Sequence, residues 1–174
     1  QSSSRALSGS FSVEVWVQLN GDDTGTLVAY DLGATEQYRL EVSSGSPLFR
    51  VNDTNGATHT LTATASIDDG AWHRIVAVWD DANDAMTLYV DSLIYVHDDL
   101  SDRAVTLVSG GGSLEIGADF SNGYVDEIRL WAGIRDRDAL AASAHSLVQP
   151  GTTVLNYRFD DGGASAEDFA QIGE

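Results

Sequence analysis

Residues 68–80 read DDGAWHRIVAVWD, and this stretch decides the fold. The acidic turn Asp68–Gly70 leads into the run Trp72–Trp79, in which alternate positions are apolar or aromatic on both faces. A second acidic turn follows at Asp80. Successive side chains of a strand point to opposite faces, so this run predicts a central strand covered on both sides. The faces occupied by Trp72 and Trp79 depend on strand register, which the pattern leaves open.

The next stretch predicts the partner of this strand. In MTLYVD (Met86–Asp91), three apolar residues alternate with Thr87, Tyr89 and Asp91, which is typical of a half-buried antiparallel strand. The polar segment Asp80–Ala85 lies between the two strands and predicts a hairpin loop.

The same alternation recurs along the chain in about a dozen short segments separated by turns. It is clearest at Phe11–Leu19, where every second residue is apolar. The pattern predicts an all-β fold, a two-sheet antiparallel jelly-roll sandwich with one short helix near the C-terminus. The predicted core contains Val13, Val15, Val17, Leu40, Ile75, Leu88, Val90, Ile128 and Leu130.

With 174 residues, the chain suits a single domain spanning residues 1–174. The serine-rich residues 1–10 predict a frayed lead-in. Residues 138–147 predict the short helix, with Asp138 as its N-cap. We expect residues 154–174 to close the domain as a strand and a tail, because the sheet would otherwise keep an unpaired edge. The alternative is that Val154 opens a second tandem repeat.

Three segments carry a resemblance to a known family. The Gly-x-Trp-His strand followed by LYVD resembles the centre of laminin-G-like domains in the concanavalin A-like lectin/glucanase superfamily. Phe11–Leu19 and Leu114–Trp131 match two further segments in the expected order, and the likeness runs from Ser8 to Phe159. The resemblance implies a jelly roll. It leaves function open, because this fold hosts lectins, adhesion modules and glycosidases.

Composition excludes several kinds of partner. The chain has 27 acidic and nine basic residues, giving a formal net charge of -18, so we expect no binding to nucleic acid. No apolar run approaches the length of a membrane span, and we expect no membrane insertion. The absence of cysteine excludes disulfides and thiol chemistry. The given sequence opens at Gln1 and shows no charged segment followed by an apolar one, so we expect a mature or excised piece of a secreted or cell-surface protein.

The resemblance implies a structural calcium site. In the superfamily, the aspartate of a V-D-x-hydrophobic-R strand often helps to hold calcium, and Asp126 occupies that position in GYVDEIRLW. The other oxygens would come from Asp160, Asp161 or Asp168. Carboxylate oxygens are the hard ligands that calcium prefers. The alternative is that Asp126 pairs with an arginine such as Arg129 or Arg158.

The resemblance also implies a second calcium site at the rim of the sandwich. Laminin-G domains often bind calcium between the loop after an early strand and the loop after an I-G strand. These loops correspond to Asn52 or Asp53 and to the turn Gly117–Asn122, which contains Asp119.

The sequence gives no support for catalysis. A retaining glycosidase needs two carboxylates about 5 Å apart on one strand face. The family signatures for such a pair, E-x-D-x-x-E and E-x-D-x-E, have no match in the chain. The four histidines lack a metalloprotease or serine-elbow context. We therefore predict no catalytic residues.

A binding module remains the main hypothesis. Aromatic rings can stack on sugars, while calcium or carboxylates can bind hydroxyls. The ligand-binding candidates are Trp16, Tyr30, Arg39 and Tyr124, although Trp16 could instead pack beneath a loop. We predict a non-catalytic extracellular module that binds a glycan or glycoprotein beside neighbouring domains of a larger surface protein. The alternatives are a protein-interaction or spacer domain of a bacterial surface adhesin and, less favoured, a glycan-active enzyme.

Overall fold

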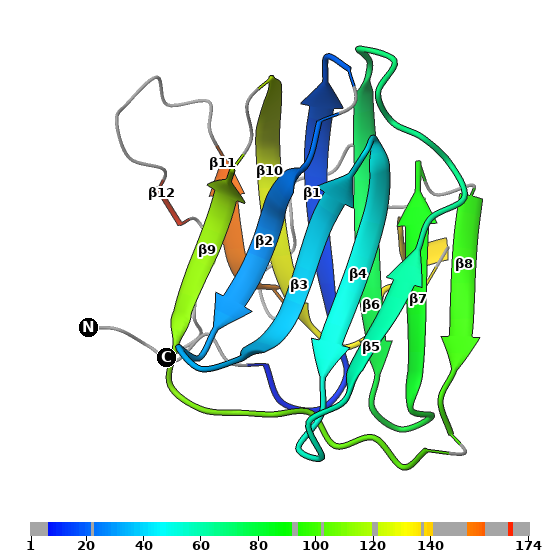
Figure 1. Cartoon of the computed structure of the whole chain (residues 1–174), viewed down its shortest axis with the longest axis vertical. Helices are drawn as coiled ribbons and strands as arrows, with labels where there is room; N and C mark the ends of the chain where they lie inside the picture. The colour runs from blue at the N-terminus through cyan, green and yellow to red at the C-terminus, as the bar shows by residue number, and fades with distance from the viewer. Residues whose placement is uncertain are drawn as a thin grey trace.

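The computed structural model describes residues 7–21, 23–91, 94–101, 103–119, 122–136, 138–140, 153–158 and 167–168. These residues form twelve strands in two facing antiparallel sheets (Figure 1). The strands are β1 (Phe11–Leu19), β2 (Gly25–Asp31), β3 (Glu36–Ser43), β4 (Ser46–Asn52), β5 (Thr58–Thr62), β6 (Trp72–Asp80), β7 (Ala85–Val90), β8 (Ile94–Asp99), β9 (Ser113–Ala118), β10 (Gly123–Ala132), β11 (Thr153–Arg158) and β12 (Glu167–Asp168).

The strand order confirms the predicted sandwich. The seven-stranded sheet has the order β12-β11-β10-β1-β6-β7-β8, and the five-stranded sheet has the order β5-β4-β3-β2-β9. Each sheet has an inner face toward the other sheet and an outer face away from it. The five-stranded sheet lies in front in Figure 1.

Strand β6 has both faces covered, as the opening stretch predicts. Ile75 and Trp79 are fully buried in the core between the sheets. On the outer face, Val76 and Val78 pack against Leu140. This register places Trp79 in the core and Trp72 on the outer face, where 44% of Trp72 is exposed.

All nine residues predicted for the core are buried. The centre of the core is aromatic: the rings of Phe11 and Tyr38 lie 5.1 Å apart, and Phe49 meets Phe11 edge-on at 6.4 Å. Burial of this apolar surface supplies the main driving force for closing the two sheets.

Helical geometry is described for residues 138–140, while the rest of the predicted helix lies outside the described residues. The cap differs from the prediction. Oδ1 of Asp136 accepts the N–H of Ala139 at 2.8 Å, and the Asp136 carbonyl accepts the N–H of Leu140 at 2.9 Å. Asp136, and not Asp138, therefore caps the helix, because an N-cap side chain bonds to an N–H two or three residues ahead.

The late strand β11 pairs with β10 in the same sheet as β1, with Leu155 opposite Leu130. Strand β12 pairs in turn with β11. The segment that begins near Val154 thus extends this sheet beyond β10.

A buried ion cluster joins the three central strands of the seven-stranded sheet. Glu14 on β1 is fully buried, and its Oε1 accepts hydrogen bonds from Arg74 on β6 at 3.0 Å and from Arg129 on β10 at 2.9 Å. Arg74 also donates to the carbonyl of Leu140 at 2.6 Å. We call Glu14, Arg74 and Arg129 the Glu14 cluster. It links the sheet to the residues that cover its outer face.

We expect Glu14→Ala to lower the free energy of unfolding by about 3–5 kcal/mol, because removing one partner leaves buried charges without compensation. Urea denaturation measures this loss. The control is Glu115→Ala, whose carboxylate is 43% exposed and lies 3.7 Å from Arg39. An exposed pair contributes at most about 1 kcal/mol, so equal losses in the two variants would contradict a central role for Glu14.

Candidate functional site

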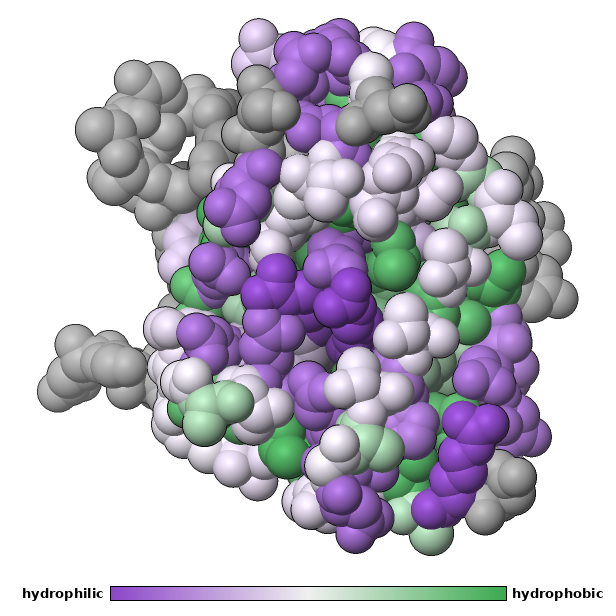
Figure 2. All heavy atoms as spheres, viewed as in Figure 1, coloured by the Kyte–Doolittle hydropathy of each residue, from purple (hydrophilic) through white to green (hydrophobic). Residues whose placement is uncertain are grey.

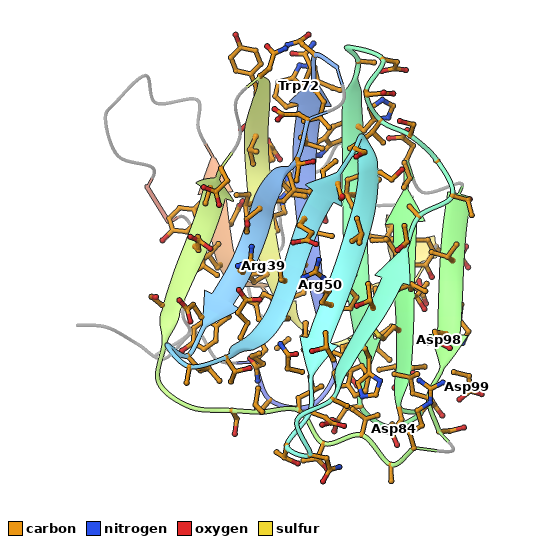
Figure 3. The ribbon with its side chains drawn as sticks, in the orientation of Figure 1. Arg39, Arg50, Trp72, Asp84, Asp98 and Asp99 are labelled. Atoms are coloured by element: carbon orange, nitrogen blue, oxygen red, sulfur yellow. The ribbon has the colours of Figure 1, made fainter. Side chains whose placement is uncertain are left out.

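Two exposed aromatic residues flank a polar side chain at one end of the seven-stranded sheet. Gln18 on β1 pairs with Trp72 on β6 and with Tyr124 on β10, so the three residues form a row across neighbouring strands. Trp72 is 44% and Tyr124 is 63% exposed. Two strand spacings place their backbones about 10 Å apart. We call these three residues the aromatic row, and Figure 3 shows Trp72 near the end of the sheet.

The predicted residues Trp16 and Asp126 lie one step further into the sheet. Trp16 pairs with Asp126 on one side and with Arg74 on the other. Trp16 and Asp126 are both partly buried, while Arg74 is almost completely buried. Trp16 therefore lies on the same outer face as the aromatic row and keeps part of its own surface in solvent.

A β-bulge sets the position of Asp126. The register between β1 and β10 shifts between Glu14 and Trp16, and Glu127 has a φ of 46°. Oδ1 of Asp126 accepts the N–H of Glu127 at 2.7 Å. Bulges re-aim side chains next to binding sites, and this one keeps Asp126 on the face that carries Trp16.

Arg129 does not form the ion pair with Asp126 that was the predicted alternative. Its guanidinium instead donates to Glu14 and to Glu127. The side chain of Arg158 lies outside the described residues.

The loop before Trp72 is tied to the end of the sheet. Nε2 of Gln18 donates to the carbonyl of Gly70 at 2.6 Å, and the N–H of Gly70 donates to the carbonyl of Leu19 at 3.1 Å. Gln18 therefore fixes the backbone beside Trp72. The sequence pattern did not identify Trp72, because its face follows from the pairing of β6 with β1.

His73 forms a clasp between this loop and the end of β7. Its Nε2 lies 3.0 Å from Oδ1 of Asp69, and its Nδ1 lies 2.8 Å from Oδ2 of Asp91. Burial lowers the pKa of His73, but hydrogen bonds to the two carboxylates outweigh it and raise the pKa above 6.5. The hydrogen bond from His73 is also the main cause that lowers the pKa of Asp69.

The rim site predicted from Asp53 and Asp119 is wrong. Tyr38 pairs with both Tyr30 and Val51, so the end of β4 lies at the same end of the sheet as the end of β2. Asp119 follows Ala118, which pairs with Thr26 at the start of β2. The two aspartates therefore lie at opposite ends of the five-stranded sheet and cannot share one ion.

Asp53 has a structural role instead. Its Oδ1 accepts the N–H groups of Asn55 and Ala57, both at 2.8 Å, and its Oδ2 lies 3.3 Å from Nε2 of His59. The backbone hydrogen bond from Ala57 is the main cause that lowers the pKa of Asp53. This geometry closes the turn between β4 and β5.

The structure describes only part of the first predicted calcium site. Asp160 and Asp161 lie outside the described residues, and Asp168 is described by its backbone, which pairs with Tyr157. Within the described ranges, no group of three or more histidine, cysteine or acidic side chains is arranged to hold a metal ion.

Tyr30 is not a ligand-binding residue. It is fully buried between the sheets, where its ring stacks on Tyr38 at 6.2 Å. Its hydroxyl donates to the carbonyl of Gly110 at 3.4 Å and accepts the N–H of Gly112 at 2.9 Å. A Cβ on Gly112 would lie 2.1 Å from the carbonyl of Asp31, so only glycine fits this close approach.

Arg39 lies on the outer face of the five-stranded sheet, directly opposite Arg50. Both oxygens of Glu36 accept from Nε of Arg39 at 2.9 Å, and Glu115 lies 3.7 Å away. The hydrogen bond to Glu36 is the largest cause that raises the pKa of Arg39. Figure 2 shows a strongly hydrophilic patch at the centre of this face, and Figure 3 places both arginines there.

Comparison with known families agrees with this architecture. The family model described as the concanavalin A-like lectin/glucanases superfamily matches residues 1–141. The chain belongs to this superfamily. A search of curated proteins found no match.

Solved structures share the fold at low sequence identity. A Bacteroides ovatus protein whose name proposes carbohydrate binding has a TM-score of 0.70 at 15% identity, over 92% of this chain and 49% of its own. The heptameric SAP-like pentraxin of Limulus polyphemus has a TM-score of 0.66 at 14% identity, over 95% and 82%. The ligand-binding domain of botulinum neurotoxin serotype D, in complex with N-acetylneuraminic acid, has a TM-score of 0.61 at 14% identity, over 83% and 38%.

The chain therefore spans little more than a third of the toxin binding domain and about half of the Bacteroides protein. Among the described residues, no helix is long and apolar enough to cross a membrane.

We expect the His73 clasp to make stability depend on pH. The folded pKa of His73 exceeds its ordinary value, so its contribution is complete below about pH 6.5 and is lost as the pH rises through the folded pKa. His73→Gln should flatten the dependence of the unfolding free energy on pH in the range above about pH 6.5. Urea denaturation across this range measures the slope.

The matched control for this prediction is His97→Gln. His97 bonds to the hydroxyl of Thr87 at 2.9 Å and has no part in the clasp. The control should retain the wild-type dependence on pH. An unchanged dependence on pH in His73→Gln would contradict a role for the clasp.

Proposed function

We propose that this domain is a non-catalytic module that binds carbohydrate, with the aromatic row as its stacking surface. The observation that carries the proposal is the pairing of Gln18 with both Trp72 and Tyr124, which places two exposed rings on one face of the sheet. Superfamily membership and the binding domains among the similar structures support this class of function.

The chemistry of the row suits a sugar chain. The faces of tryptophan and tyrosine rings are apolar and carry a partial negative charge, so they pack against the C–H faces of pyranose rings. Two strand spacings separate Trp72 from Tyr124, and a linked pair of sugar rings roughly spans this distance of about 10 Å. The side chain of Gln18 lies between them, and its hydrogen bond to the carbonyl of Gly70 holds the loop that carries Trp72.

We expect Trp72→Ala and Tyr124→Ala each to weaken glycan binding by about 3–10-fold, because an aromatic contact contributes about 0.5–1.5 kcal/mol beyond its buried area. Affinity electrophoresis in gels with neutral polysaccharides, followed by titration calorimetry with the oligosaccharide that binds, measures the effect.

The control is Ile134→Ala, which removes a large apolar side chain that is 48% exposed away from the row. This variant should bind like the wild type. If the folded protein migrates equally fast in gels with and without every polysaccharide, the carbohydrate-binding proposal is wrong. A spacer or protein-interaction role in a surface adhesin would then replace it. Turnover of a bound polysaccharide would instead indicate an enzyme.

Calcium forms a further part of the proposal. Asp126 supplies a partly buried carboxylate, and β11 and β12 extend the same sheet beyond β10. This donor set has the hard oxygen chemistry that calcium prefers, and Asp160, Asp161 or Asp168 would complete it. A bound ion would neutralise part of the net charge of -18 and hold the last strands to the sheet.

We expect calcium to raise the midpoint of thermal unfolding, and Asp126→Asn to abolish that rise, because a ligand bound only to the native state stabilises it. The scan is run with EDTA, magnesium or calcium at matched ionic strength, since screening alone also relieves repulsion among carboxylates. Equal effects of magnesium and calcium, or an unchanged response in the variant, would remove Asp126 from the proposal.

The expected setting of the module is extracellular. Laminin-G-like and lectin domains typically act outside the cell, and the chain matches only part of the length of most similar structures. We therefore place it in a secreted or cell-surface protein, beside neighbouring domains.

A further inference from the structure

A polar pocket lies on the outer face of the five-stranded sheet, at the end where β2 and β4 finish. Its volume is about 360 Å³. The lining comes from the ends of β2 and β4, the turn between β2 and β3, and the starts of β3 and β5. The lining residues are Asp31, Gly33, Ala34, Thr35, Glu36, Arg50, Asn52 and Thr58.

Hydrogen bonds already fix the walls of this pocket. Nδ2 of Asn52 donates to the carbonyl of Glu36 at 2.8 Å, and its Oδ1 accepts from the hydroxyl of Thr58 at 2.5 Å. Oδ1 of Asp31 accepts the N–H of Gly33 at 2.6 Å, which holds the turn between β2 and β3. A ligand would therefore meet a site that needs little ordering on binding.

Donors and acceptors remain available on opposite walls. Oδ2 of Asp31 accepts no hydrogen bond from any residue that the structure describes. Arg50 is 40% exposed and uses one terminal nitrogen for Glu41, which leaves its other N–H groups open within the described part of the chain. Each oxygen of a carboxylate can accept up to about two hydrogen bonds, and a guanidinium has about five N–H donors in a fixed plane.

The lining excludes two classes of ligand. Among the residues that the structure describes, no aromatic and no large apolar side chain lines the pocket, so stacking and apolar burial contribute little. The lining carries two carboxylates, Asp31 and Glu36, against one guanidinium, so an anion would meet net repulsion. A neutral ligand that both donates and accepts hydrogen bonds matches the remaining groups.

We propose that this pocket binds a neutral, hydroxyl-rich ligand of the size of about one sugar ring, and that it does so independently of the aromatic row. Each hydroxyl of such a ligand donates to a carboxylate and accepts from an N–H group at the same time. The pocket faces outward from the five-stranded sheet, whereas the aromatic row faces outward from the seven-stranded sheet at the opposite end.

The separation of the two sites has a functional consequence. A site on each outer face lets one domain hold two different chains, or two segments of one long chain, at once. Such a domain would cross-link a polysaccharide that carries both epitopes, and the linkage would strengthen apparent affinity through effective concentration.

The test follows amide shifts in ¹⁵N-labelled protein during titration with the methyl glycosides of glucose, galactose, mannose and N-acetylglucosamine, and with N-acetylneuraminic acid. We expect at least one neutral glycoside to shift the amides of Gly33 and Thr35. Asp31→Asn should weaken this binding about tenfold or more while its Oδ1 still accepts the N–H of Gly33.

The matched variants Thr58→Val and Thr60→Val test whether the pocket wall contributes to binding. Both threonines lie on β5 and are exposed, but Thr58 lines the pocket and Thr60 does not. Thr58→Val should weaken binding by about 3–10-fold, and Thr60→Val should leave it unchanged. In Trp72→Ala, the shifts at Gly33 and Thr35 should persist, which separates this site from the aromatic row.

Three results would overturn the proposal. The first is the absence of shifts at Gly33 and Thr35 with every neutral glycoside. The second is tighter binding of N-acetylneuraminic acid than of any neutral sugar, which would assign an anionic ligand. The third is loss of the shifts in Trp72→Ala, which would mean that only the aromatic row binds.

Discussion

A single buried carboxylate organises the centre of this molecule. Oε1 of Glu14 accepts from Arg74 at 3.0 Å and from Arg129 at 2.9 Å, so the three central strands of one sheet share one ion cluster. A buried charge is stable only when it is paired, and this requirement fixes β1 between β6 and β10. The exposed end of the same three strands carries the aromatic row. The alignment of Trp72, Gln18 and Tyr124 thus depends on a register that the Glu14 cluster helps to set.

The sequence predicts the fold because its signals are local and repeated. Alternating apolar residues identify the strands, and all nine residues predicted for the core are buried. Tyr30 lies in β2, where every residue except the last is buried, so this strand places it in the core although we expected it to bind ligand. We predicted Asp138 as the N-cap, and the structure has Asp136 there. Both are good capping residues, and only the hydrogen-bond geometry distinguishes them.

The candidate site depends on relations between strands, and the sequence carries little information about these. Trp72 reaches the outer face because it pairs with Gln18, a partner 54 residues away in the chain. Strand pairing separates Asp53 from Asp119. The two residues matched two family loops, but they lie at opposite ends of one sheet. Asp126 was placed on a strand correctly, but the bulge at Glu127 decides which face it shares.

The Glu14 cluster also has a consequence for the order of folding. Glu14 and Arg129 are 115 residues apart, so the first strand of the domain meets its second arginine only after most of the chain has been synthesised. Long-range pairing of this kind slows folding. Until its partner strands form, β1 has unpaired edges and an unpaired charge on Glu14. The carboxylate that stabilises the finished sheet would also discourage β1 from burying itself early against a wrong partner.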